Sequence, residues 1–181
     1  DGTPKLYQKT SIEVDGETAP PWKVVIRQDE DRTVFSGGPE NSVWGHITGE
    51  GEFDVTVSDP LPIQFRGAGR IAESQIDTTL TDVRLSLGDV GQLMRLSAFQ
   101  LTDGVARGDL HITGPVNDPD FYGTLRVREA MARSEFVPEA LGPFATSVEF
   151  QEKELVVREE RVPAGPGSAL ARAEFVMDHW T

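Results

Sequence analysis

The feature that most constrains this chain is a repeated strand–turn–strand pattern. Residues 51–56 read GEFDVT and residues 108–113 read GDLHIT, and a proline follows each glycine by eleven residues, at Pro62 and Pro119. Both copies then enter a similar extended run, at residues 67–73 and 123–129. A repeat of this size indicates an array of strands, and arrays usually act through an extended surface.

We therefore expect one β-rich segment over residues 1–181, with pseudo-repeats at about 49–105 and 106–162. The chain starts at Asp1 without a methionine, so we interpret it as a piece of a longer protein. Its length is sufficient to bury a real core.

Within each run, apolar and polar residues alternate with period two. Phe53 and Val55 share one parity, while Asp54 and Thr56 share the other. Successive side chains on a strand point to opposite faces, so each run has one apolar and one polar face. Such runs predict a mainly β fold with an antiparallel sheet whose polar face is exposed to solvent.

Helical signals are short. Asp89 could cap a turn in which Val90, Leu93 and Met94 recur at helical spacing. Pro138 could open a second turn that Gly142 closes. Neither segment is long enough for the crossover helix of a parallel sheet, so one or two helical turns are expected beside the strands.

Composition excludes several function classes. The formal net charge of −13 disfavours nucleic acid, whose phosphates require Lys and Arg. The absence of cysteine excludes disulfides, thiolate metal sites and cysteine nucleophiles. No apolar run approaches the roughly 18 residues of a membrane span.

No catalytic or metal-binding motif stands out, so we expect no enzyme activity, cofactor or metal. The three histidines, His46, His111 and His179, have no metal spacing and are interpreted as solvated positions. The acidic runs at residues 29–31 and 159–160 are interpreted as solvated, because adjacent carboxylates on a strand point apart. Residues 117–120 read NDPD, which could suggest calcium, but turn chemistry explains them better.

The second repeat carries a resemblance to a known family. Residues 108–114, GDLHITG, followed by residues 118–127, DPDFYGTLRV, resemble the recurring unit of the TamB and wider AsmA-like family, in its C-terminal β-repeat region. In that unit a strand ends in Gly, reaches an Asp-Pro turn and resumes as a strand through Gly. The similarity extends over about residues 105–162 and weakens over residues 49–73, where Pro60-Leu61-Pro62 replaces Asp-Pro.

The resemblance implies a curved, incompletely closed antiparallel sheet with an apolar groove, often called a β-taco. It also implies a periplasmic segment of a translocation and assembly module protein that is anchored in the inner membrane of a two-membrane bacterium. The implied partner is an outer-membrane barrel of the BamA-like TamA type. No catalytic residues carry over.

We accordingly expect a hydrophobic groove that binds lipid acyl chains or unfolded outer-membrane strands, in phospholipid transport or outer-membrane protein assembly. The expected lining comprises the apolar-parity residues Phe53, Val55, Val57, Ile63, Phe65, Leu110, Ile112, Phe121, Leu125, Val127, Val148 and Phe150.

Two alternatives remain open. The chain could act as a β-strand template whose sheet edges pair with unfolded outer-membrane clients. It could also be a closed carbohydrate-binding β-sandwich in which Trp22, Trp44 and Trp180 stack on sugars, although these three share no repeat position.

Overall fold

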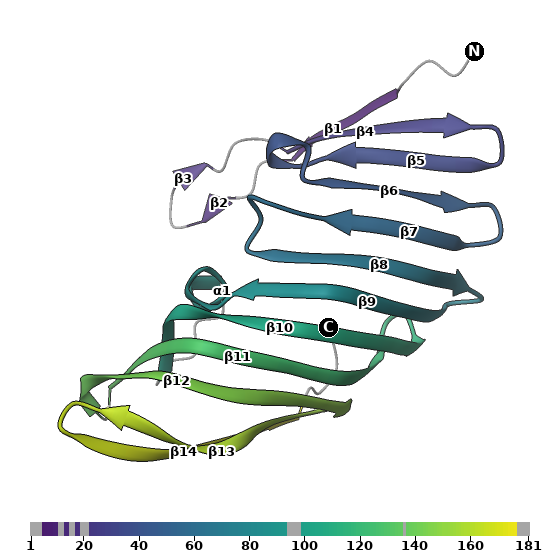
Figure 1. The fold of residues 1–181 in the computed structure, drawn as a ribbon. Coiled ribbons are helices and arrows are strands. Elements are labelled where there is room, and N and C mark those ends of the chain that lie inside the picture. The colour runs from purple at the N-terminus through teal and green to yellow at the C-terminus, as the bar shows by residue number, and fades with distance from the viewer. Residues whose placement is uncertain are drawn as a thin grey trace.

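A computed structural model of the chain describes residues 5–10, 13–14, 17–18, 22–93, 99–135 and 137–176. It contains one twelve-stranded sheet and a separate hairpin of β2 (Glu13–Val14) and β3 (Glu17–Thr18), as Figure 1 shows. The sheet strands are β1 (Lys5–Thr10), β4 (Trp22–Asp29), β5 (Arg32–Gly37), β6 (Val43–Thr48), β7 (Glu52–Val57), β8 (Ile63–Ala72), β9 (Gln75–Ser86), β10 (Phe99–Pro115), β11 (Asp120–Ser134), β12 (Val137–Glu152), β13 (Glu154–Ala164) and β14 (Gly167–Val176).

The sheet is an antiparallel meander in which β4 to β14 are neighbours in chain order. The strand β1 pairs with β4 at one edge, and β14 pairs with β13 at the other. The two edge strands do not pair with each other, so the sheet is not closed into a barrel. The mainly β, incompletely closed antiparallel fold expected from the sequence is therefore confirmed.

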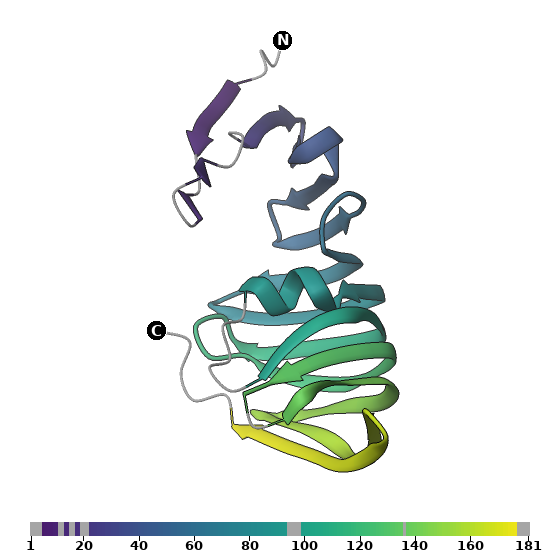
Figure 2. The same ribbon diagram turned by 90° about the vertical axis from the view of Figure 1, so that its left-hand side faces the viewer.

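The C-terminal half of the sheet folds back on itself. Positive φ angles occur at Gly104 (115°), Glu129 (53°) and Gly142 (115°), on the three neighbouring strands β10, β11 and β12. The strand registers shift at the same places, which marks β-bulges that bend and twist a strand. Because the bulges line up across the sheet, these strands turn together, and Figure 2 shows the resulting curl from the end.

Close packing fixes this bend. Ala130 is fully buried between the bends of β10 and β12. A Cβ atom added to Gly104 would lie 2.7 Å from the Cα of Ala130, and one added to Gly142 would lie 3.0 Å from the Sδ of Met131. Only glycine combines the positive φ with such a close approach of two backbones.

Helical structure is brief. The helix α1 (Leu87–Leu93) confirms the turn expected at Asp89, although it begins two residues before that aspartate. Asp89 therefore lies in the first turn, where its Oδ2 accepts a hydrogen bond from the Ser86 hydroxyl at 2.5 Å. Met94 lies outside the described residues. A short 3-10 helix, η1 (Pro39–Asn41), follows β5.

The second expected turn, from Pro138 to Gly142, is wrong because these residues belong to β12. Val137 pairs with Ser134 and Leu141 pairs with Ala132 of β11. The register is irregular between these two pairs, and such positions tolerate a proline within a strand.

The two repeat copies form similar hairpins in opposite orientations. The first copy supplies β7 and β8, and the second supplies the paired parts of β10 and β11. Successive strands alternate in direction, and the equivalent strands of the two hairpins, such as β7 and β10, are three positions apart in the sheet. The β7–β8 and β10–β11 turns therefore lie at opposite ends of the strands, as Figure 1 shows.

Candidate functional site

One continuous row of apolar or glycine residues crosses ten strands on a single face of the sheet, which we call the inner face. Each member pairs directly with the next on the neighbouring strand, so all of them point the same way. The row runs through Ile26, Phe35, Gly45, Val55, Gly67, Leu80, Leu110, Gly123, Phe150 and Leu155.

All twelve residues expected to line a groove lie on this face. Val55, Leu110 and Phe150 belong to the row itself. The others flank it: the adjacent pairs are Val57 with Phe65, Phe53 with Gly69, Ile63 with Leu85, Ile112 with Phe121, Leu125 with Val148, and Val127 with Ala106.

The sequence reasoning missed part of the inner face in the N-terminal half. Ile26, Phe35, Val43 and Ile47 lie on it, because each pairs across the ladder with another member of that face. The same period-two signal is present in these runs. These runs fall outside the repeat from which the lining was predicted.

Exposure of the inner face changes along the sheet. Among the described residues, every buried hydrophobic side chain lies between Val83 and Val162. Leu125 and Val127 are only 3% and 6% exposed and pack with Val83, Leu87 and Ala106 in one core. The apolar side chains of β4 to β8 remain partly accessible, and Ile63 is 40% exposed.

Folding of the sheet explains this difference. Beyond the bend, Ala132, Leu141 and Val162 form a second core that joins the first through Leu101 and Phe144. The C-terminal half thus covers its own apolar face, whereas β4 to β8 have no such cover from the described part of the chain (Figure 2).

In the accessible half of the row, the neighbouring apolar side chains fill the space above the glycines. Val55 is flanked on its two neighbouring strands by Gly45 and Gly67. A Cβ atom at Gly67 would lie 3.0 Å from side-chain carbons of both Val55 and Leu80, and one at Gly45 would lie 2.8 Å from the Phe35 ring. Large apolar side chains therefore lean over the glycines and form a level apolar strip.

The opposite face, which we call the outer face, is polar. His46 pairs with Asp54 there, and His111 pairs with Thr79 and Tyr122. The Nε2 atom of His111 lies 3.1 Å from Oδ1 of Asp77, so this half-exposed histidine has a carboxylate partner. His179 lies outside the described residues.

The NDPD segment forms a turn that holds a lysine. The Nζ atom of Lys153 donates to the backbone oxygens of Asp118 and Pro119 and to Oδ1 of Asp118, each at 2.7 Å, and lies 3.3 Å from Oδ1 of Asp120. Partial burial lowers the pKa of Lys153, but the hydrogen bonds that its ammonium group donates to the Asp118 and Asp120 carboxylates, together with their negative charges, raise the pKa above its ordinary value. An ammonium group therefore occupies the position that a cation would take.

Among the other polar candidates, His46 and the acidic run at residues 29–31 line one hollow on the described part of the chain. No cluster of three or more His, Cys, Asp or Glu able to hold a metal occurs within the described ranges. The acidic run at residues 29–31 lies at the β4–β5 turn, where Asp29 pairs with Arg32 at 3.3 Å. Trp44 is 43% exposed on the outer face, while the Trp22 side chain and Trp180 are not described.

Comparisons with known proteins add no relative. A scan against protein families and searches of curated proteins and of solved structures found no match to this chain. In the part of the chain that the structure describes, no helix has the length and apolarity to cross a membrane.

Proposed function

We propose that this chain presents its inner face as an apolar β groove to lipid acyl chains. The observation that supports the proposal is the apolar row across ten strands of a sheet that stays open along β4 to β8. Soluble proteins rarely leave a contiguous apolar strip accessible unless a ligand or partner uses it.

The energetics favour an acyl chain as the occupant. Four interstrand steps of about 4.8 Å make the accessible part of the row, from β4 to β8, about 19 Å long. Each buried CH₂ group contributes about 0.8 kcal/mol, so a long apolar chain binds without any specific polar contact. An acyl chain that lies across the strands would contact only the apolar side chains and glycines of the row.

The two halves of the sheet would play different parts. An acyl chain would enter along β4 to β8, where Phe53, Val55 and Val57 are partly accessible. Leu125 and Val127 lie in a packed core, so a ligand reaches them only if the folded C-terminal strands open. The accessible half is therefore the proposed binding region.

The resemblance to the TamB and AsmA-like family supports a place for this groove in the cell envelope. We infer a periplasmic segment of a protein that is anchored in the inner membrane by residues outside this segment. Its function would be phospholipid transport or outer-membrane protein assembly with a TamA-type barrel. The net charge of −13 disfavours nucleic acid as the ligand.

A pair of neighbouring substitutions tests the groove. Val55→Asp places a charge on the inner face, and Thr56→Asp places the same charge on the outer face of the same strand. The expected result is that a fluorescent fatty acid binds the parent and T56D protein but binds V55D at least tenfold more weakly, because a carboxylate is costly beside an acyl chain. Equal binding by all three proteins, or no uptake by the parent, would contradict the proposal.

Edge pairing is the second candidate, and the free edge of β14 favours it. Among described residues this strand pairs only with β13, and its Leu170 and Val176 are 65% and 66% exposed. An unpaired edge is a template for an added strand. If the edge alone acts, V55D should still bind an unfolded outer-membrane strand peptide with the parent's affinity.

A further inference from the structure

The outer face carries an unusual row of arginines, away from the proposed groove. Arg84 of β9, Arg107 of β10 and Arg126 of β11 lie directly opposite one another on adjacent strands. The row continues to Gln64 on β8 and Ser147 on β12, so it contains no carboxylate. Three guanidinium groups are thus aligned in a chain whose net charge is −13.

Several other arginines in the described part of the chain pair with carboxylates. Arg158 pairs with Glu149, Arg32 with Asp29 and Arg66 with Asp82. In the described part of the chain, no ion pair joins Arg84, Arg107, Arg126 or the nearby Arg128 to a carboxylate. Like charges directly opposite on neighbouring strands destabilise a sheet, so the row costs stability unless an anion compensates it.

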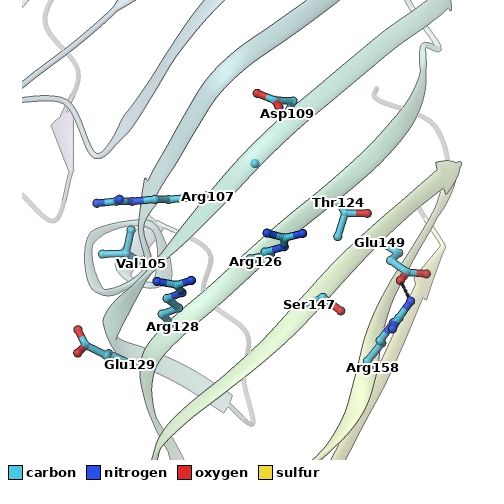
Figure 3. Close-up of a pocket in the computed structure, with 11 residues that line it drawn as sticks. Val105, Arg107, Asp109, Thr124, Arg126, Arg128, Glu129, Ser147, Glu149 and Arg158 are labelled. Carbon is cyan, nitrogen blue, oxygen red and sulfur yellow. Dashed lines mark ion pairs between the residues drawn. The ribbon is translucent and has the colours of Figure 1, made fainter.

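The same surface is hollowed. Arg107, Arg126 and Arg128 line a depression of 890 Å³ over β10 to β13, with Gly108 and Ser147 among its other lining residues. Figure 3 shows the arginine side chains of β10 and β11 reaching over one face of these strands.

Two of the three carboxylates around the hollow are already engaged. Oδ1 of Asp109 accepts a hydrogen bond from the backbone N–H of Asp82 at 3.0 Å. Glu149 is held by Arg158, as the dashed line in Figure 3 marks. Glu129 lies at the bend of β11. The guanidinium groups of the row therefore remain available to a ligand.

We propose that this hollow is a binding site for a phosphate group, separate from the apolar groove. Guanidinium groups bind phosphate oxygens through two parallel N–H···O bonds, and such charge-assisted bonds are the strong ones. The strand spacing of about 4.8 Å places successive arginines close enough to share one phosphate or to bind two linked phosphates. The Ser147 hydroxyl, which also lines the hollow, would add a neutral donor at one end of the row.

The test uses inorganic pyrophosphate with sodium chloride at matched ionic strength as the blank. Pyrophosphate should shift the backbone amide resonances of Gly108 and Thr124, which line the hollow, and leave those of Val34 on β5 unchanged. The double variant R107Q/R126Q should bind at least tenfold more weakly. The matched double variant R27Q/R172Q removes two exposed arginines elsewhere and should bind within twofold of the parent.

A stability measurement separates binding from a structural role. Because the row repels itself, R107Q should be at least as stable as the parent without ligand. A lower thermal midpoint for R107Q, equal weakening by both double variants, or no resonance shift would overturn the proposal.

Vesicles distinguish the source of the phosphate. If the ligand is a lipid headgroup, phosphatidylglycerol vesicles should bind the parent more tightly than R107Q/R126Q, and pyrophosphate should compete. If it is a soluble phosphate compound, pyrophosphate should bind while vesicles do not. Failure in both arms refutes the site and leaves the proposed groove untouched, since the groove lies on the other face.

Discussion

Replacing Leu125 with alanine tests whether the inner face is a sealed core in one half and an accessible strip in the other. Leu125 is 3% exposed, whereas Ile63, on the same face, is 40% exposed. Leu125→Ala and Ile63→Ala each remove three carbon atoms from a side chain. Those atoms are worth about 2.4 kcal/mol of transfer free energy if they are fully buried.

The expected costs differ about twofold. In Leu125→Ala a residual cavity adds to the transfer loss, so the free energy of unfolding should fall by about 3 kcal/mol. In Ile63→Ala only about 60% of the surface leaves water on folding and no closed cavity forms, so the cost should be about 1.4 kcal/mol.

Urea unfolding followed by far-ultraviolet circular dichroism measures both values. Thermal midpoints should fall by about 6–12 °C for L125A and about half as much for I63A, at roughly 2–4 °C per kcal/mol for a domain of this size. Equal costs would refute the division of the inner face into a core and an accessible strip. A smaller cost for L125A than for I63A would refute it more strongly.

Two further predictions concern the bend and the turn that holds Lys153. Gly104→Val should destabilise the protein by about 3 kcal/mol, because a Cβ atom at φ 115° would meet the backbone of Ala130, whereas Gly49→Ala, in open space, should be nearly neutral in urea unfolding. Lys153→Met should lower the thermal midpoint at neutral pH. Since the folded pKa of Lys153 is raised, its contribution is present below about pH 10.4 and lost as pH rises through the folded pKa, so the difference between parent and K153M should shrink at high pH. A difference that stays constant to high pH would contradict the role of the charged ammonium.

Much of the fold followed from local pattern. Alternation in residues 53–57 and 108–113 predicted strands, and Pro62 and Pro119 each stand directly before the next strand, as expected. Alternation also predicted that Phe53 and Phe150, distant in sequence, lie on one face. They do so because side-chain direction in a strand repeats every two residues and each antiparallel pair preserves the face.

The wrong prediction at Pro138 and the unforeseen arginine row both result from pairing between neighbouring strands of the sheet. Pro138 looked like the start of a helical turn, yet β11 recruits the segment as a strand. The arginine row was not foreseen either, because Arg84, Arg107 and Arg126 are far apart in sequence. Their alignment depends on strand registers that include a bulge near Asp82, which has a φ of 54°.

The amino-acid sequence is enough to predict that this chain forms strands with one apolar and one polar side. That information is local, since it requires only the alternation of residue types and the chemistry of turns. The tertiary structure alone decided where the apolar side is sealed and where it stays accessible. That outcome depends on Gly104, Glu129 and Gly142 lining up across three strands, so that the sheet bends back over Leu125 and leaves Val55 uncovered.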